Sequence, residues 1–199
     1  MTEKKSNHIS SEDVLVRSQL TPNPHALKFI VNHPLKKTGK VTYRNIDEAS
    51  GVILVEDIFN LENIVQAFLF QNTLTVSHNG EWDNSELKNF IEPIIKTRMP
   101  IHNPSFQTPD EKAALDKLKK REDYSPERQE IEKILDKTIR PGLQADGGDL
   151  EVVEYKHPEL YISFEGACGS CPSSVMGTLQ AIQGILQNEF HEDIQVIPE

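Results

Sequence analysis

Short stretches in which hydrophobic and polar residues alternate recur along the first half of the chain. A period of two puts every second side chain on one face of a sheet, so these stretches predict strands. They lie at residues 14–18, 26–31, 41–43, 64–70 and 74–77. Pro22 and Pro24 stiffen the turn between the first two strands, and residues 71–73 form a hairpin turn between the last two. Residues 36–40 are expected to form a loop.

Helical spacing of apolar residues appears twice in the same half. One helix is predicted within residues 47–60, although Gly51 and the apolar run after it would also suit a strand. A second is predicted around residues 87–95, where Pro93 is expected to distort the helix or divide it into two pieces. We therefore expect a compact α+β domain over residues 13–99.

Two segments lack a periodic pattern. Residues 1–12 are polar and mixed in charge, which predicts a disordered tail. Residues 100–124 are rich in proline at first and charged afterwards, so they are predicted to be a linker between two domains. Part of this linker, residues 110–122, is expected to form a solvated helix; the alternative is that it has no stable structure, because short polar helices are marginal alone.

Residues 125–199 predict a second, smaller domain. Ser125, Pro126 and Glu127 have the residue types of a helix N-cap, first position and first turn. An apolar stripe continues this helix to about residue 140, and the elements expected after it are listed here in order: strands around residues 150–155 and 160–165, a loop with two cysteines, a helix over residues 175–186 and a strand at 194–196. The fold class is thus α+β with two small domains, and the second has the order helix, hairpin, CxxC loop, helix and strand.

The composition is that of a soluble globular protein. Of the 199 residues, 37% are hydrophobic and 26% are charged. There is no apolar run of roughly 18 residues, and the first residues do not have the pattern of a signal or transit peptide. We therefore expect a soluble, cytoplasmic protein.

Negative charge is concentrated in the second domain. Residues 1–124 contain 16 Lys and Arg against 17 Asp and Glu, whereas residues 125–199 contain 5 against 14. Nucleic acids and anionic membranes both attract basic surfaces. A nucleic acid or a membrane is therefore not expected as a partner.

The candidate chemistry lies in the chain's two cysteines, Cys168 and Cys171, which stand between a predicted strand and a predicted helix. Two thiols are half of a four-coordinate metal site, so the other ligands would have to come from elsewhere. A position at a helix N-terminus is expected to lower the thiol pKa. Three readings of the residues stay open: two incidental thiols, a thiol–disulfide oxidoreductase that uses Cys168 and Cys171, and half of a zinc site.

Other chemistry-bearing residues have simpler structural interpretations. Asp146 and Asp149 suit a turn between a helix and a strand better than acid–base catalysis. The seven histidines show no ligand spacing, and His191, although near the end of the last helix, is not expected to be a ligand. Trp82 is expected to pack within its domain. Two glycines seven residues apart, at positions 177 and 184, are expected to permit close packing within the fold.

Three motifs of the second domain occur in the order found in a known family. They are Ile139-Arg140-Pro141, Asp146-Gly147-Gly148-Asp149-Leu150 and Gly166-Ala167-Cys168-Gly169-Ser170-Cys171-Pro172-Ser173-Ser174. Together they resemble the NifU C-terminal-like domain of Nfu proteins over roughly residues 127–198. Thr21-Pro22-Asn23-Pro24 with Leu27-Lys28-Phe29 is similar to the Nfu N-terminal domain. The resemblance thus extends over nearly the whole chain.

This resemblance implies an iron–sulfur cluster scaffold or carrier and not an enzyme. It implies that Cys168 and Cys171 from each of two protomers bind one [4Fe-4S] cluster, so that the chain is a homodimer when the cluster is bound. The implied partners are apo iron–sulfur client proteins and upstream cluster-assembly proteins. The N-terminal domain has no cysteine, so we expect it to bind partner or client proteins instead of the cluster.

Overall fold

The computed structural model describes residues 9–108, 124–169 and 172–199. The chain divides into two compact units, one made of residues 1–20 and 25–106 and the other of residues 21–24 and 107–199. Each has its own hydrophobic core. The predicted linker helix at 110–122 and most of the predicted disordered tail lie outside the described residues. Ser11–Asp13, at the border of that tail, form a 3-10 helix, η1, whose N-cap is Ser10.

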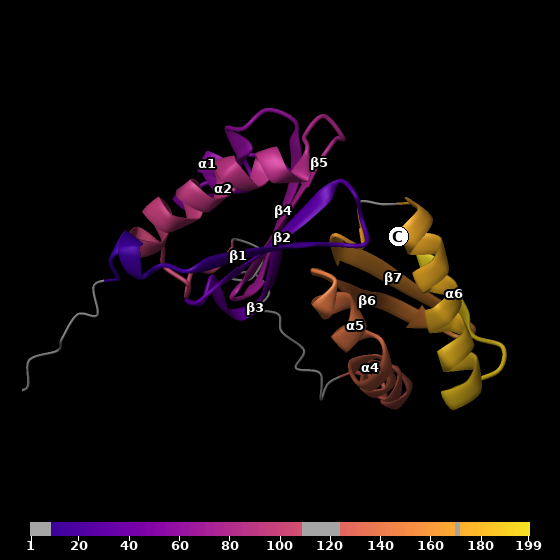
Figure 1. Cartoon of the computed structure of the whole chain (residues 1–199). Coiled ribbons are helices and arrows are strands. Elements are labelled where there is room, and N and C mark those ends of the chain that lie inside the picture. Colours follow the sequence, from indigo (N-terminus) through magenta and orange to yellow (C-terminus); the bar gives the residue numbers. More distant parts are fainter. Residues whose placement is uncertain (1–8, 109–123, 170–171) are drawn as a thin grey trace, which may run out of the picture. The chain divides into compact units, whose positions relative to one another are not determined.

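A five-stranded antiparallel sheet forms the centre of the first unit (Figure 1). Its strands are β1 (Val16–Leu20), β2 (Ala26–Val31), β3 (Lys36–Tyr43), β4 (Ile64–Gln71) and β5 (Thr73–His78), in the order β1-β2-β5-β4-β3. All five predicted strands are therefore present. The two hairpins predicted from turn residues, β1–β2 and β4–β5, pair as expected.

The expected loop at residues 36–40 is wrong, because these residues belong to β3. Lys36 pairs with Gln71 and Lys40 with Phe70, with an irregularity between them. The Lys36 side chain is almost fully buried, and its Nζ donates a hydrogen bond of 2.8 Å to the Phe106 carbonyl and lies 4.4 Å from the centre of the Phe106 ring. These contacts come from residues far away in sequence, which local polarity does not report.

Two helices, α1 (Ile53–Phe59) and α2 (Asn84–Arg98), cover one face of this sheet (Figure 1). The first is shorter than the predicted range, since Gly51 just before it has a φ of +88°. The second continues through Pro93 as one helix, followed by the 3-10 turn η2 (Met99–Ile101). Pro93 is exposed, so the carbonyl that lacks its hydrogen bond faces the solvent and the helix need not break.

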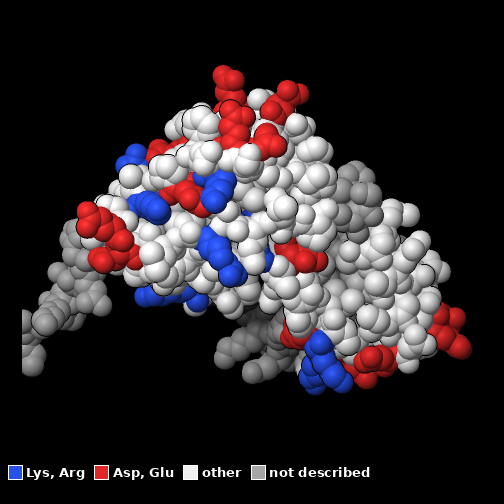
Figure 2. Space-filling model, in the orientation of Figure 1, with Lys and Arg blue, Asp and Glu red and all other residues white. Residues whose placement is uncertain are grey.

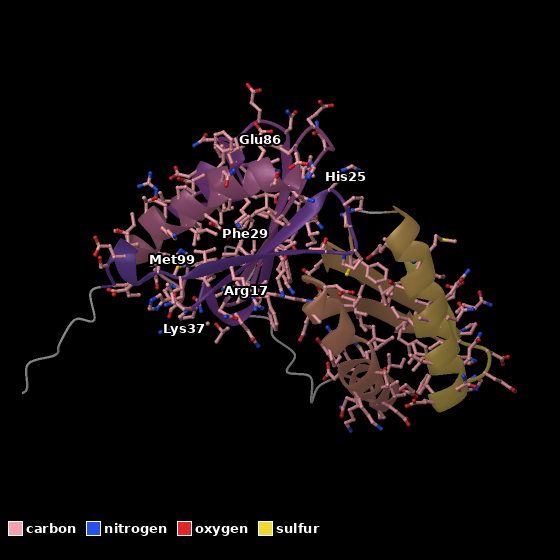
Figure 3. All side chains as sticks on the ribbon, viewed as in Figure 1. Arg17, His25, Phe29, Lys37, Glu86 and Met99 are labelled. Atoms are coloured by element: carbon pink, nitrogen blue, oxygen red, sulfur yellow. The ribbon has the colours of Figure 1, made fainter. Side chains whose placement is uncertain are left out.

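The core of the first unit lies between the sheet and these helices. Phe29 from β2 and Met99 after α2 lie inside it, whereas Glu86 projects from α2 into solvent (Figure 3). Trp82 packs against this core and makes an edge contact with Phe90, as expected for a residue that packs within its domain. Asp83 caps α2 by accepting a hydrogen bond from the Ser85 amide.

The second unit packs helices on a three-stranded sheet in the order β6-β7-β8. Its elements are α4 (Pro126–Thr138), α5 (Arg140–Ala145), β6 (Gly148–Lys156), β7 (Glu159–Gly166), α6 (Pro172–Glu189) and β8 (Gln195–Pro198). β6 and β7 form the predicted hairpin, and β8 runs parallel to β7 after the α6 crossover. All the predicted elements are present in the predicted order, with one additional helix, α5.

The short helix α5 was not predicted. Its sequence, Arg-Pro-Gly-Leu-Gln-Ala, has the proline and glycine that normally end a helix. Here Pro141 occupies the first turn of a new helix, where a missing N–H costs no hydrogen bond, and Leu143 is buried in the core. Within the described residues, no helix has the length and hydropathy needed to cross a bilayer.

Candidate functional site

Cys168 lies just beyond the C-terminal end of β7 and four residues before the first position of α6. Its side chain is half-buried and packs against the core of the second unit. Cys168 is the one cysteine among the described residues, and its thiol is free. Cys171, the second predicted ligand, lies outside the described residues.

Two glycines leave room for the Cys168 turn. A Cβ atom on Gly148 would lie 2.7 Å from Sγ of Cys168 and 2.6 Å from the Glu165 carbonyl oxygen. A Cβ atom on Gly169 would lie 2.6 Å from the Phe164 carbonyl oxygen. Any larger residue at either position would collide with backbone that belongs to β7. β6 and the cysteine turn can therefore approach each other this closely only because positions 148 and 169 are glycine.

Backbone hydrogen bonds hold the same turn in place. The Ala167 amide donates to the Gly147 carbonyl, and the Gly169 amide donates to the Gly166 carbonyl, both at 3.2 Å. Gly147 and Gly166 have φ angles of +84° and +65°, which residues with a Cβ rarely adopt. The glycine pair at positions 147 and 148, where β6 begins, thus has a direct geometric role beside Cys168.

The electrostatic surroundings of Cys168 differ from the expectation. Burial, and then the negative charges of Asp146 and Asp149, together raise the pKa of the Cys168 thiol to about 12. The sequence predicted a lowered thiol pKa from the adjacent helix N-terminus, and for Cys168 this is wrong. Desolvation and two nearby carboxylates outweigh the helix dipole, whose effect is limited to the first turn.

A buried arginine joins the elements around this turn. Arg140 places Nη2 2.8 Å from Oε2 of Glu132, Nε 2.9 Å from Oδ1 of Asp136 and Nη1 3.1 Å from Oδ1 of Asp149. Nη1 also donates to the Leu150 carbonyl at 2.5 Å. One guanidinium thus links α4, α5 and the start of β6, which is the strand that contacts Cys168.

Asp149 has the structural role that its turn position predicted. Its Oδ1 accepts hydrogen bonds from Arg140 and from the Leu150 amide, and the residue is buried. The importance of Arg140 was missed, because the sequence suggested only that a helix ends there. Asp136 four residues earlier and Glu132 eight residues earlier were the available signal, since these positions lie on one side of a helix.

The histidine near the last helix is far from the cysteine turn. His191 packs edge-on against His157, with ring centres 4.8 Å apart. His157 precedes β7 and Cys168 follows it, so the eight residues of β7 separate the two ends by roughly 25 Å. The two histidines therefore lie at the opposite end of the sheet from Cys168.

The glycines at 177 and 184 do not serve the packing role that we expected. A Cβ atom on either would meet nothing within 4 Å. Both therefore lie on the open side of α6, and the expectation of close packing within the fold is wrong. Across the residues that the structure describes, no group of three or more His, Cys, Asp or Glu side chains could hold a metal ion.

Two family models match this chain in consecutive segments. The NifU-like domain matches residues 131–197, which include the cysteine turn and the Arg140 network. The N-terminal domain described as scaffold protein Nfu/NifU N terminal matches residues 16–100. The chain belongs to the Nfu family. The resemblance inferred from three short motifs is thereby confirmed.

Three Nfu relatives illustrate the similarity. NifU-like protein 4, mitochondrial, of Arabidopsis thaliana is 29% identical over 182 residues, covering 90% of this chain and 64% of the relative. The human NFU1 iron-sulfur cluster scaffold homolog, mitochondrial, is 29% identical, covering 87% and 67%. The Drosophila grimshawi protein of the same name is 28% identical, covering 86% and 57%. The chain thus spans 57% to 67% of the length of these three relatives.

A solved structure was also found to be similar. The solution structure of a NifU-like protein from Saccharomyces cerevisiae aligns with a TM-score of 0.42 and 18% identity, covering 51% of this chain and 87% of that one.

Proposed function

We propose that this chain is an iron–sulfur cluster scaffold or carrier that binds one [4Fe-4S] cluster between two copies of itself and delivers it to apo-proteins. Cys168 and Cys171 of each copy would supply the four thiolates. The human and Drosophila grimshawi relatives carry the words iron-sulfur cluster scaffold in their names, which supports this class of function.

The observation that carries the proposal is the half-complete thiol site. The chain has two cysteines, three positions apart, and Cys168 follows β7 in a turn built on glycines. Four-coordinate iron in such clusters normally has one thiolate for each iron. A second copy of the chain, related by two-fold symmetry, would supply the two missing thiolates from its own Cys168 and Cys171.

The raised pKa of Cys168 is compatible with a cargo site. Each thiol must lose its proton as the iron–sulfur bond forms, so cluster binding releases protons and is weaker at lower pH. Asp146 and Asp149 disfavour the bare thiolate of Cys168, while a bound iron ion compensates that negative charge. When the cluster leaves, the Cys168 thiolate readily takes up a proton because its pKa is high. This favours transfer of the cluster to a client whose own thiolates then bind the iron.

The same property argues against the alternative, a thiol–disulfide oxidoreductase. Such enzymes attack through a thiolate whose pKa is near or below neutrality. The pKa of Cys168 is shifted in the opposite direction. Cluster transfer, by contrast, is ligand exchange and involves no substrate turnover, so we propose that the protein is not an enzyme.

Anaerobic reconstitution with iron and sulfide tests the proposal. We expect about four irons and four sulfides for each pair of chains, together with the mass of a dimer. A Cys171→Ser variant should stay monomeric and colourless. A variant that retains iron as a monomer would refute the shared cluster, and a metal-free wild type that reduces disulfides catalytically would favour the alternative.

The proposed partners are apo iron–sulfur client proteins and upstream assembly proteins, which we propose contact the first unit. Residues 125–199 alone should then reconstitute the cluster but deliver it poorly to some acceptors. Loss of cluster binding in this fragment would contradict that division of roles.

The cytoplasmic location stays a prediction, while the relatives named above include proteins described as mitochondrial. Imaging of a tagged chain in its own cells tests this location.

A further inference from the structure

The solvent-facing side of α6 has no charged residue. Seven residues form it: Met176, Gly177, Gln180, Ala181, Gly184, Gln187 and Asn188. At 100° per residue they occupy a continuous arc of roughly 140° on the helix. We call this set the uncharged face of α6. The helix contains one charged residue, Glu189, at its last position and outside this arc.

This face contrasts with the rest of the second unit. On α4, the exposed positions after Pro126 are Glu127, Glu130, Lys133, Asp136 and Lys137, every one charged. The solvent-exposed side of a helix normally has such polar and charged residues. Figure 2 shows the corresponding contrast, with a white surface over α6 and coloured side chains near its end and over α4.

The residues of the uncharged face carry no charge and are mostly exposed. Met176 is 60% exposed. A Cβ atom on Gly177 or Gly184 would touch nothing within 4 Å, so packing within the chain does not require glycine there. Glycine in a helix interior costs up to about 1 kcal/mol relative to alanine. Glycine at these positions would allow a second helix to pack closely against α6, which would offset this cost.

We propose that the uncharged face of α6 is the surface on which a second copy of this chain docks, so that the four cysteines meet around one cluster. This inference rests on the proposed function and names the interface that it requires. α6 begins at Pro172, directly after Cys171, so a copy that supplies two thiolates must approach at this end of the helix. The symmetric pairing puts the same face on both sides of the contact.

Charge explains why the contact is made on this face. Residues 125–199 contain 14 acidic and 5 basic residues, so two copies of this unit repel each other over most orientations. The repulsion is smallest where the two contacting surfaces have no charge. A client protein or the first unit of the same chain would be the occupant if this inference were wrong, and dimer formation in the test distinguishes a second copy from either of them.

The test adds charge to the face without adding bulk to a core. Gln180→Glu with Ala181→Glu changes two exposed positions to a good helix former and makes the net charge more negative by two. The matched control, Lys133→Gln with Lys137→Gln, makes the same change in net charge at exposed positions of α4. Both variants and the wild type are reconstituted anaerobically as full chains, and iron, sulfide and mass are measured.

We expect the wild type and the α4 control to form cluster-bound dimers. The α6 variant should lose at least about tenfold in dimer formation and in iron content, because four added charges meet in one small contact. Its metal-free form should melt like the wild type. Equal cluster loading in a dimer of the α6 variant would overturn the proposed face while leaving the scaffold function standing.

A charge-reversed partner excludes a simple folding defect. A second variant, Gln180→Lys with Ala181→Lys, is mixed with the acidic variant before reconstitution. We expect the mixture to regain cluster and to contain one chain of each kind by native mass spectrometry. Failure of the mixture to regain cluster would overturn the proposed face. A wild type that binds no cluster in a dimer would instead refute the proposed function and, with it, this interface.

Discussion

Gly148 and Cys168 are so close that a Cβ atom on residue 148 would lie 2.7 Å from the Cys168 sulfur. The same atom would lie 2.6 Å from the carbonyl oxygen of Glu165, which is paired with Asp149 in the hairpin. The oxygen is a backbone atom of β7 and the sulfur belongs to a short, half-buried side chain, so neither moves away easily. The position of Cys168 is therefore tied to the absence of a side chain at residue 148.

Replacing Gly148 by alanine should disturb the cysteine turn. We expect the Gly148→Ala variant to lose about 1–3 kcal/mol of unfolding free energy, since overpacking forces the backbone to shift. It should also bind less cluster on anaerobic reconstitution, as measured by iron content. Gly142→Ala is the control, because a Cβ there meets nothing within 4 Å in an exposed helix. That variant should be neutral or up to about 1 kcal/mol more stable.

Removing the Arg140 side chain should destabilise the second unit. Arg140→Ala leaves Glu132 and Asp149 buried without their cation, and such a loss typically costs about 3–5 kcal/mol. Calorimetry should report a lower melting transition for this unit. Trp82, the chain's one tryptophan, lies in the first unit, so its fluorescence should report a transition that is unchanged.

A partly exposed ion pair provides the comparison for Arg140. Arg98 pairs with Asp57 in the first unit, and both side chains retain partial solvent exposure. Arg98→Ala should therefore cost about 0–1 kcal/mol. An Arg140→Ala cost as small as that of Arg98→Ala would show that the buried network does not stabilise the cysteine-bearing unit.

The thiol of Cys168 should react slowly in the metal-free protein. In a Cys171→Ser background, alkylation of Cys168 by iodoacetamide at pH 8 should be at least about a hundredfold slower than in the unfolded chain, because burial and then Asp146 and Asp149 raise its pKa to about 12. Asp146→Asn should accelerate the reaction by removing one charge. A rate in the folded chain equal to that in guanidinium would contradict the raised pKa.

The same shift has a consequence for stability at high pH. The folded-state pKa of Cys168 lies above the ordinary value of 9.0, so its neutral thiol contributes stability that is complete below pH 9. This contribution should decrease as the pH rises from 9 toward 12, because the unfolded chain then releases the proton more readily. Denaturation of the metal-free chain at pH 8 and pH 10, compared with Cys168→Ser, measures the effect.

The first unit should lose stability in mild acid. Burial, and then the nearby His25, lower the pKa of His78 below 6.5, and burial lowers the pKa of His102. A depressed histidine pKa stabilises the fold above pH 6.5, and this contribution is lost as the pH falls through the folded value. Trp82 fluorescence should report a lower urea midpoint at pH 5 than at pH 7. His78→Gln should reduce that difference, leaving the part due to His102.

Local pattern predicted most of the architecture. Alternation identified the strands of both units, because one buried face is enough to impose a period of two. The errors occurred where distant residues decide the structure. β3 extends over Lys36 because β4 pairs with it and Phe106 covers its side chain, and α5 forms because the core accepts Leu143.

The cysteine site was predicted only in part. The spacing of Cys168 and Cys171 pointed to this segment as the candidate site, which stays a prediction. The sign of the Cys168 pKa shift was wrong, since it depends on burial and on Asp146 and Asp149, more than 15 residues away in sequence. The Arg140 network and the open side of the two α6 glycines were likewise visible only in three dimensions.

By itself the sequence determined the order of elements, the number of thiols and the family, because periodicity, residue counts and motif order are local properties of the chain. Only the tertiary structure decided the state of the Cys168 thiol, the role of Arg140 and the uncharged face of α6. These depend on which distant groups are brought within a few ångströms of each other, and desolvation and Coulomb interactions act over those distances and not along the sequence.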